Sequence, residues 1–512
     1  MDYLTFPDVL RRAAWRRPDQ TFIYWSDRRR SITYSDGERA SDAVAGGLAE
    51  LGVRKGDRVA ILAHNGLDYV LAMFGIWKLG AVSAHINVQQ VHNLAWFVND
   101  AGPRILIYTG DLHDAVMHHL PHMPSLEHLI CFDGARPSAH DWNALLATDL
   151  KPPAVILSAD DAAHLSYTSG SSGKPKGAVL AHGYTARATH CIAERLQLSP
   201  ADVSLGPTSL ASSYHLVANL LPAMHRCAQV GVRKQWDAAA VVAEIAERGV
   251  TFIAANPLLL ADLLNHIRQT GSRPATLRFV MCGGASAPLE LKRAYRDELG
   301  IPLVEAYGQS ELGGFVAMGY PRLEDDAHLS TIGPELPDRE VRIADQDDRP
   351  VAVGLPGEIL IRGGVMLGYH NLPEKTREVL RNGWLHTGDV GIMDADGYIT
   401  LLGRLSERIV MNGRAVFPRP LEEALLRHPA VRYVCVVGAP HPQSGRVPRA
   451  FVELFPGASA TPDELLAHCQ DLLGAQNTLR EVEILAQMPM TPTGKIARAD
   501  LQACVDSAGA ER

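Results

Sequence analysis

The chain has 512 residues, of which 46% are apolar and 21% charged, and its formal net charge is −8. At roughly 100–200 residues per domain, this length predicts two to four domains with substantial cores. The composition excludes a disordered, collagen-like or coiled-coil chain, and the negative charge gives no reason to expect a nucleic-acid partner. The most apolar stretch, around residues 69–79, contains Lys78 and is too short to span a bilayer. No basic region followed by an apolar run opens the chain, so we expect no secretory signal and a cytoplasmic location.

Cysteine, histidine and lysine usage narrows the chemistry. The seven cysteines are scattered and never form a C-x-x-C pair, which predicts a reducing compartment without a zinc or disulfide framework. The histidines between residues 113 and 128 are interrupted by proline, a spacing more typical of a polar surface than of a metal site. Only nine lysines stand against forty arginines. Each lysine therefore marks a place where a compact ammonium is favoured over a guanidinium.

From about residue 30 to 260, strand and helix patterns alternate, as in a doubly wound α/β domain. Residues 58–62 read as a strand and residues 67–79 as a buried helix. Asp237 can cap a helix that ends at Gly249 and presents Val241, Val242 and Ile245 as its apolar face. A strand is then expected at residues 250–255.

After about residue 320 the pattern changes to short strands and tight turns. Strands are expected at 357–362 and 398–402, with a turn at 394–397, so residues 320–400 predict a small antiparallel or barrel part. Beyond residue 405 we expect a compact α+β region with a helix at 421–427 and strands at 431–437 and 449–454.

The most informative segment is the loop Tyr167–Gly177, which lies between two predicted strands. Its glycines let backbone amides converge, its hydroxyls add donors, and its lysines add positive charge, so the loop suits a polyphosphate. It is not a Walker A loop, because Pro175 follows Lys174 where that motif needs Ser or Thr. A flexible Gly/Ser linker is the alternative, but linkers rarely connect two buried strands. The residues expected to hold phosphate, through side chains or main-chain amides, are Thr168, Ser169, Gly170, Ser171, Ser172, Gly173, Lys174 and Lys176.

This loop resembles the corresponding loop of the adenylate-forming superfamily, the acyl-CoA synthetases and their relatives. Further matches follow in the family's order and cover nearly the whole chain. They are Gly283–Pro288 (adenine side), Tyr307–Glu311, Trp384–Asp389 (ribose side), Gly403–Arg404 (hinge) and Pro489–Ile496 (C-terminal lysine loop).

The resemblance implies an α/β fold with a large N-terminal domain of two doubly wound subdomains plus a small β-barrel, and a small mobile α+β C-terminal domain. We expect the first domain at residues 1–404, the second at 405–512, and the hinge near Ser406.

The resemblance also implies ATP-dependent activation of a carboxylic acid to an acyl-adenylate, followed by transfer to the thiol of CoA. Lys495 would bridge the acid and the α-phosphate, Glu311 would hold Mg²⁺, and Ser310 would donate to the α-phosphate. Asp389 would bind the ribose and Arg404 the sugar or phosphate. The remaining nucleotide contacts would come from Gly284, Ala285, Ser286, Tyr307, Gly308 and Gln309.

In the family the C-terminal domain rotates after adenylation. Gly413 would then let the pantetheine arm of CoA pass close to the backbone, and a plain hairpin turn is the alternative for that glycine.

Two departures from the family pattern leave other functions open. Ser406 stands where the hinge usually carries Asp or Lys. The family commonly shows Pro-Leu-Phe-His lining the acyl pocket, whereas this chain has Pro207–Leu210 and then His215 five residues later, so either the loop is shifted or the pocket has lost its imidazole. One alternative is therefore an enzyme that forms only the thioester, from an acyl-adenylate made by a partner enzyme. Another is an acyl-AMP ligase that loads a carrier protein, and a third is a non-catalytic relative.

The sequence says less about the identity of the carboxylic acid substrate. The expected pocket segments, residues 214–220, 254–256 and 312–318, are apolar and rich in small residues, with no acid to pair an α-amino group. We therefore expect a sizeable apolar carboxylic acid rather than an amino acid.

Overall fold

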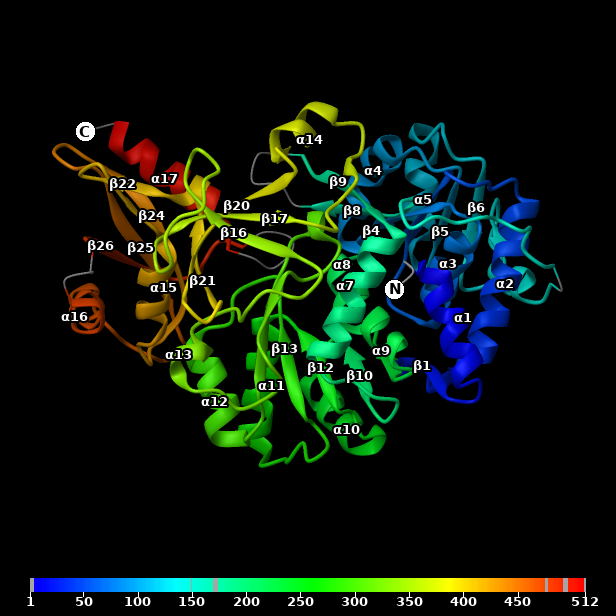
Figure 1. The fold of residues 1–512 in the computed structure, drawn as a ribbon, viewed down its shortest axis with the longest axis horizontal. Helices are drawn as coiled ribbons and strands as arrows, with labels where there is room; N and C mark the ends of the chain where they lie inside the picture. The colour runs from blue at the N-terminus through cyan, green and yellow to red at the C-terminus, as the bar shows by residue number, and fades with distance from the viewer. Residues whose placement is uncertain (1–3, 149, 169–173, 475–477, 491–495, 511–512) are drawn as a thin grey trace. The chain divides into compact units, whose positions relative to one another are not determined.

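The structure is a computed structural model that describes residues 4–148, 150–168, 174–474, 478–490 and 496–510. The chain divides into two compact units (Figure 1). Unit 1 comprises Met1–Ala287, Leu291–Val341 and Ile361–Leu385, and unit 2 comprises Pro288–Glu290, Arg342–Leu360 and His386–Arg512.

Unit 1 contains two eight-stranded sheets. The first has the order β18-β9-β8-β4-β3-β5-β6-β7, and its strands from β8 to β7 are parallel, whereas β9 and β18 are antiparallel to their neighbours. Its strands are β3 (Arg58–Leu62), β4 (Val82–Ile86), β5 (Ile105–Tyr108), β6 (His128–Cys131), β7 (His140–Asp141), β8 (Ala162–Thr168), β9 (Lys176–Ala181) and β18 (Gly368–Tyr369).

The second sheet has the order β15-β14-β13-β12-β10-β11-β1-β2, parallel except at its two edge strands. Its strands are β1 (Thr21–Trp25), β2 (Arg30–Thr33), β10 (Val203–Gly206), β11 (Gln229–Val232), β12 (Phe252–Ala255), β13 (Phe279–Cys282), β14 (Leu303–Tyr307) and β15 (Ala317–Met318).

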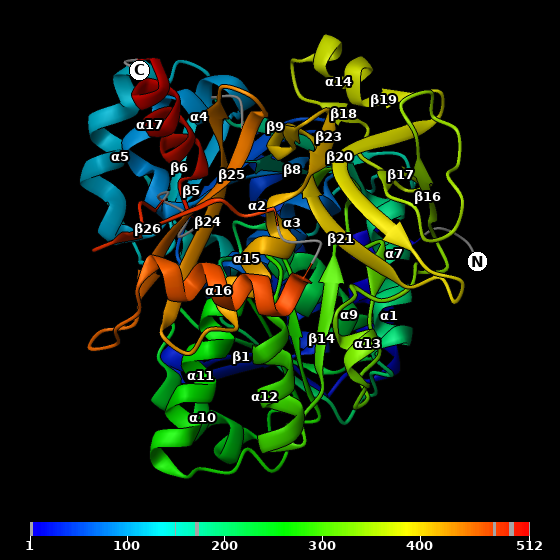
Figure 2. The ribbon, with the colours of Figure 1, turned by 90° about the vertical axis from the view of Figure 1, so that its left-hand side faces the viewer.

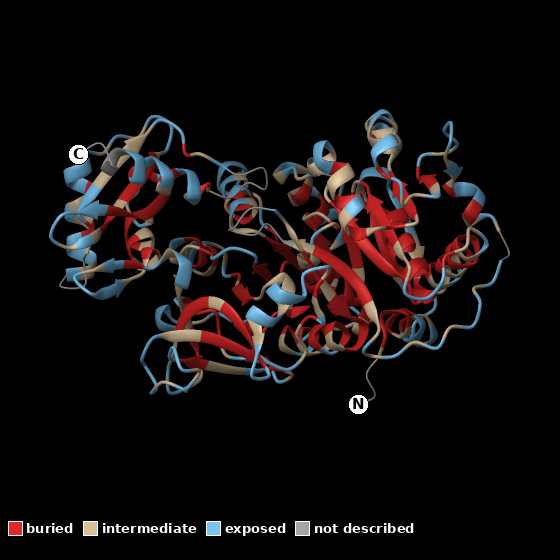
Figure 3. Ribbon diagram, turned by 90° about the horizontal axis from the view of Figure 1, so that it is seen from above, coloured by how far each residue is buried: buried red, intermediate tan, exposed pale blue. Residues whose placement is uncertain are grey.

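Helices cover both faces of these sheets, as parallel strands require. Up to residue 379 they are α1 (Phe6–Arg16), α2 (Tyr34–Glu50), α3 (Leu67–Lys78), α4 (Leu94–Ala101), α5 (His113–His119), α6 (Trp142–Leu146), α7 (His182–Arg195), α8 (Ser213–His215), α9 (Leu221–His225), α10 (Ala238–Arg248), α11 (Pro257–Thr270), α12 (Leu289–Leu299), α13 (Asp326–Leu329) and α14 (Pro373–Val379). The largest core takes side chains from both sheets and from α1, α2, α3 and α9. A second core lies between β12, β13 and the helices α10, α11 and α12, and a third beneath α4 and α5. Figure 3 shows the buried strands flanked by helices whose outer turns are exposed.

Two smaller sheets follow, antiparallel except that β26 pairs with β25 in parallel. One has the order β16-β17-β20-β19 with β21 beside β20, from β16 (Glu340–Ala344), β17 (Gly357–Arg362), β19 (Leu380–Arg381), β20 (Trp384–Met393) and β21 (Ile399–Arg404). The other, in unit 2, has the order β23-β22-β25-β24 with β26 beside β25. It consists of β22 (Ile409–Met411), β23 (Arg414–Val416), β24 (Val431–His441), β25 (Gly445–Leu454) and β26 (Glu481–Leu485).

Helices cover both faces of the last sheet. The helices α15 (Pro418–Leu426) and α16 (Pro462–Leu473) pack against one face, and α17 (Arg498–Ala510) packs against the other (Figure 2). The predicted fold class is confirmed: two doubly wound sheets, a small antiparallel sheet and a C-terminal α+β part.

Candidate functional site

The predicted phosphate loop connects two antiparallel strands, as expected. Thr168 pairs with Lys176 and Tyr167 with Gly177, so Lys174 and Lys176 stand where the hairpin opens. The residues Ser169, Gly170, Ser171, Ser172 and Gly173 lie outside the described residues.

The start of this hairpin is anchored from α4. The Tyr167 hydroxyl donates to Asp100 Oδ2 at 2.8 Å. Burial and the nearby Asp100 charge raise the pKa of this phenol, which therefore keeps the proton that it donates. The strand end that carries the loop is thus fixed.

Glu311 lies on a short 3₁₀ turn, Ser310–Leu312, directly after β14. Its Oε1 accepts a hydrogen bond from the Tyr369 hydroxyl at 2.7 Å, and its main-chain oxygen accepts from Met366 N at 2.7 Å. Lys176 Nζ lies 4.6 Å from the centre of the Tyr369 ring. Tyr369 therefore contacts both a predicted phosphate-binding cation and the predicted metal ligand.

Glu311 fits a metal-binding role on the charges around it. It is half-buried, and none of the described cations forms an ion pair with it. The Glu311 carboxylate offers acceptor oxygens, which are the ligands that Mg²⁺ prefers.

Tyr307 is the last residue of β14, and Gly308 and Gln309, also predicted to contact the nucleotide, follow it. Tyr307 is buried at the end of the strand. A Cβ at residue 308 would lie 2.6 Å from Gly314 O, so only glycine fits there. Ser213 Oγ reaches Ser310 Oγ at 3.5 Å.

Gly284, Ala285 and Ser286 are exposed, and a buried acid supports them. Glu305 Oε1 accepts from Ser286 Oγ at 2.6 Å and from Ala287 N at 3.4 Å. Lys292 forms an ion pair with Glu305, and both side chains are almost fully buried, with exposed fractions of 3% and 4%.

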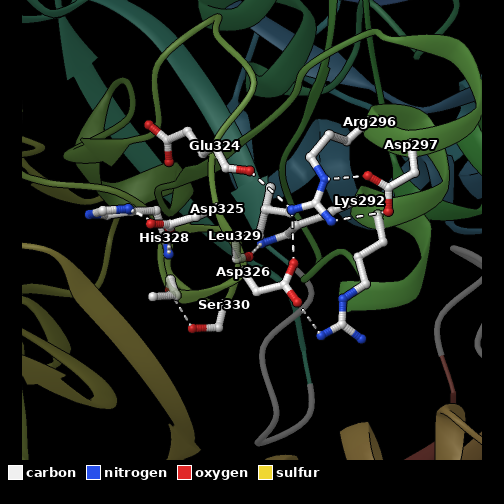
Figure 4. A network of polar contacts seen from close by, with 11 residues as sticks. Lys292, Arg296, Asp297, Glu324, Asp325, Asp326, His328, Leu329 and Ser330 are labelled. Atoms are coloured by element: carbon white, nitrogen blue, oxygen red, sulfur yellow. Dashed lines mark hydrogen bonds and ion pairs between the residues drawn. The ribbon is translucent and has the colours of Figure 1, made fainter.

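Lys292 also joins this loop to the segment around α13. Its Nζ donates to Leu329 O at 2.5 Å and to Thr331 O at 3.3 Å. Figure 4 shows Lys292 beside the network in which Arg296 donates to Asp326. Sequence reasoning missed both Glu305 and Lys292, although the scarcity of lysine was a signal for the second.

The predicted acid-pocket segments come together in unit 1. The Tyr214 hydroxyl donates to Ala255 O at 3.2 Å and to Met281 O at 3.4 Å, and its ring meets that of Phe315 edge-on at 5.9 Å. His215 points elsewhere: it is fully buried and its Nδ1 bonds Thr208 O at 2.9 Å.

Unit 2 carries the ribose-side and hinge residues. Arg404 Nε lies 2.7 Å from Asp389 Oδ1, and the two residues are paired across β20 and β21. Asn412 and Gly413, both with positive φ, form the two-residue turn between β22 and β23. The hairpin is thus observed, and a CoA contact by Gly413 stays a prediction. Lys495 lies outside the described residues.

Two features are absent from the part of the chain that the structure describes. No group of three or more His, Cys, Asp or Glu is arranged to hold a metal ion. None of the helices is both long enough and apolar enough to cross a bilayer.

Comparison with known families explains this arrangement. The AMP-binding enzyme family matches residues 10–370, and the AMP-binding enzyme C-terminal domain matches residues 420–495. The chain belongs to the AMP-binding enzyme family. Both matched ranges fall on segments that carry the predicted motifs.

Curated relatives of this AMP-binding enzyme extend along most of its length. The feruloyl-CoA synthase of Amycolatopsis sp is 31% identical over 474 residues, covering 92% of this chain and 94% of the relative. The sulfoacetate–CoA ligase of Cupriavidus necator is 32% identical over 505 residues, covering 96% of each. Among solved structures, an anthranilate CoA ligase in complex with anthranoyl-AMP matches with a TM-score of 0.90 at 25% identity, covering 99% of this chain and 98% of that one.

Proposed function

We propose that this AMP-binding enzyme is an acyl-CoA ligase. A carboxylate attacks the α-phosphorus of ATP to give an acyl-adenylate and pyrophosphate. The thiol of CoA then attacks the acyl carbon, loses its proton and displaces AMP. The observation that carries the proposal is the placement of Lys176 and Glu311 against one tyrosine where the β8–β9 hairpin opens.

The first step brings two anions together, which costs Coulomb energy unless cations are positioned around them. Lys174 and Lys176 hold the phosphates, and Lys495 bridges the acid and the α-phosphate. Glu311 would hold Mg²⁺, which would supply positive charge to offset the negative charge of the phosphates. Asp389 accepts from the ribose hydroxyls, and its ion pair with Arg404 orients it.

The acyl acceptor comes from outside the chain. All seven cysteines are free, and burial raises the thiol pKa of several, to about 11 for Cys191 and Cys469 and about 12 for Cys435. A thiol with a raised pKa is a poor nucleophile near neutral pH, so CoA supplies the sulfur.

The acid we propose is apolar and sizeable. Tyr214 and Phe315 give the pocket segments an aromatic surface, which suits a hydrophobic acyl group. The named relatives differ in their acids, one being a feruloyl-CoA synthase and another a sulfoacetate–CoA ligase, so their names do not choose the acid.

We also propose that residues 405–512 move as the mobile domain, with the hinge near Ser406. The observed compact units divide the chain elsewhere, since unit 2 also takes in residues 342–360 and 386–404. Limited proteolysis with and without acyl-adenylate tests the boundary: a cleavage site near Ser406 that changes with the ligand supports it, and unchanged cleavage contradicts it.

The experiment that tests the function follows AMP, pyrophosphate and thioester separately, with ATP, Mg²⁺, CoA and a panel of acids. Lys495→Ala is expected to reduce adenylation by a factor on the order of 10²–10³ and to leave thioester formation from a synthetic acyl-adenylate intact. The exposed Lys375, paired with Glu378, provides the matched control, and Lys375→Ala should leave both steps unchanged.

Three outcomes would contradict the proposal. Thioester formation from acyl-adenylate without any ATP turnover would indicate the enzyme that forms only the thioester. Acylation of a carrier protein but not of CoA would indicate the carrier-loading ligase. ATP binding with no product at all would indicate a non-catalytic relative.

A further inference from the structure

A buried arginine lies beside the predicted metal ligand. The side chain of Arg339, in the segment just before β16, is fully shielded from solvent. Its Nη1 donates to Gly363 O at 2.7 Å and to Gly364 O at 2.6 Å, and its Nη2 donates to Leu312 O at 2.9 Å. The carboxylate of Asp338, also buried, lies 3.5 Å from Nη1 and supplies the opposite charge, while Nε has no hydrogen-bond partner among the described residues. Burying a guanidinium is costly, and the three carbonyls and this carboxylate offset most of that cost.

The backbone at residues 363 and 364 is shaped around this guanidinium. Both glycines have positive φ, +92° and +61°, which turns their carbonyls toward Arg339. A Cβ on residue 364 would lie 1.7 Å from Arg339 Nη1. The guanidinium thus occupies the space that a side chain at residue 364 would need.

Both segments that Arg339 joins hold Glu311. Leu312 is the next residue in the chain after Glu311. On the other side, Met366 N donates to Glu311 O, and the Tyr369 hydroxyl donates to the Glu311 carboxylate. Arg339 therefore ties the turn that carries Glu311 to the segment 363–369 that positions both its main chain and its side chain.

We propose that Arg339 is a positioning residue for Glu311, and through it sets the affinity of the enzyme for the divalent cation bound with ATP. The inference rests on the proposed function, in which Glu311 holds Mg²⁺. Arg339 acts through the main chain: its hydrogen bonds fix the two loops between which the carboxylate is held.

The test measures metal binding directly, using Mn²⁺ with ATP and electron paramagnetic resonance, without any acid or CoA. In Arg339→Lys a single ammonium replaces the planar guanidinium and cannot donate hydrogen bonds to all three fixed carbonyls. We expect the dissociation constant for Mn²⁺ to rise about tenfold or more. The Mg²⁺ concentration that gives half-maximal pyrophosphate exchange should rise by the same factor.

Arg195 is the matched control. It too donates to main-chain carbonyls of unit 1, those of Met318, Pro334 and Glu335, rather than to those of Leu312, Gly363 and Gly364. Arg195→Lys should lower the melting temperature while leaving Mn²⁺ affinity within about twofold of the parent. If the role of Arg339 were purely structural, Arg339→Lys would likewise lower the melting temperature and leave Mn²⁺ affinity within about twofold of the parent.

A second variant keeps the test decisive where Arg339→Lys does not fold. Gly364→Ala displaces the guanidinium without removing it and should also weaken Mn²⁺ binding. If Arg339→Lys folds and binds Mn²⁺ as tightly as the parent, the inference is overturned. If Arg339→Lys does not fold, parent-like Mn²⁺ affinity in Gly364→Ala overturns it. If Glu311→Gln weakens Mn²⁺ binding in that case, the proposed function stands and only the role of Arg339 falls. If the parent protein neither binds Mn²⁺ with ATP nor forms AMP, both fall.

Discussion

The ion pair of Lys292 and Glu305 is a residue-scale feature that joins stability to nucleotide binding. Both side chains are buried, and Glu305 also holds Ser286 Oγ and Ala287 N. Lys292→Met leaves a buried carboxylate without its cation, which should lower the free energy of unfolding by about 3–5 kcal/mol. Urea denaturation followed by tryptophan fluorescence measures this loss.

An exposed lysine in a comparable ion pair shows whether burial causes the loss of stability in Lys292→Met. Lys375 pairs with Glu378, and both side chains are more than half exposed. Lys375→Met should change the unfolding free energy by less than about 0.5 kcal/mol. Adding Glu305→Met to Lys292→Met should recover much of the loss, since no charge then stays buried. Equal losses for the two single lysine variants would contradict the interpretation.

At the scale of elements, α10 shows how local signals set a helix. Asp237 accepts a hydrogen bond from Ala240 N at 2.8 Å, and Gly249 ends the helix with φ at 65°. Asp237→Ala removes the cap and should cost about 1 kcal/mol of stability, whereas Asp237→Asn should cost a few tenths. Thermal denaturation of the three proteins side by side tests this. An Asn variant as unstable as the Ala variant would assign the effect to the carboxylate charge instead.

The same helix shows what the sequence could predict. Its cap, apolar face and terminating glycine are all within 13 residues, and the observed bounds follow them. The strands β3 and β17 also match their predicted ranges, because each is a short run of apolar residues between turn residues. The hairpin of β24 and β25 is longer than the strands predicted at 431–437 and 449–454, and it includes Pro440 and Pro448 within its ladder.

The site was less predictable where its contacts are distant in the sequence. Glu311 and Lys176 were expected from their motifs, but Tyr369, which contacts both, is 58 residues from the first. Arg339 lies 24 and 25 residues from the glycine carbonyls that it binds. No periodicity or spacing encodes such contacts, because they arise only when loops at the ends of separate strands fold together.

At the scale of the molecule, three buried histidines make the stability of unit 1 depend on pH. His164, His182 and His215 are fully shielded from solvent, and each has an Nε2 without a hydrogen-bond partner among the described residues. Burial lowers their pKa values to about 3, 4 and 4 respectively. They are therefore neutral in the folded protein at pH 5, where an exposed histidine would be protonated.

The sign of the effect follows from linkage. Below about pH 6.5 the unfolded chain binds protons at these histidines and the folded chain does not, so stability falls as pH falls, until the folded pKa values are reached. Each of these histidines contributes about 1.4 kcal/mol per pH unit over that range, and His85 and His225, whose pKa values burial also lowers, add to the slope. All seven tryptophans belong to unit 1, so their fluorescence in urea titrations at pH 7, 6 and 5 reports on this unit. His215→Gln should reduce the slope between pH 6 and 5 by about 1 kcal/mol per pH unit, whereas His92→Gln, at an exposed histidine, should leave it unchanged. A slope that His215→Gln does not alter would mean that this imidazole gains a proton in the folded protein as readily as in the unfolded chain.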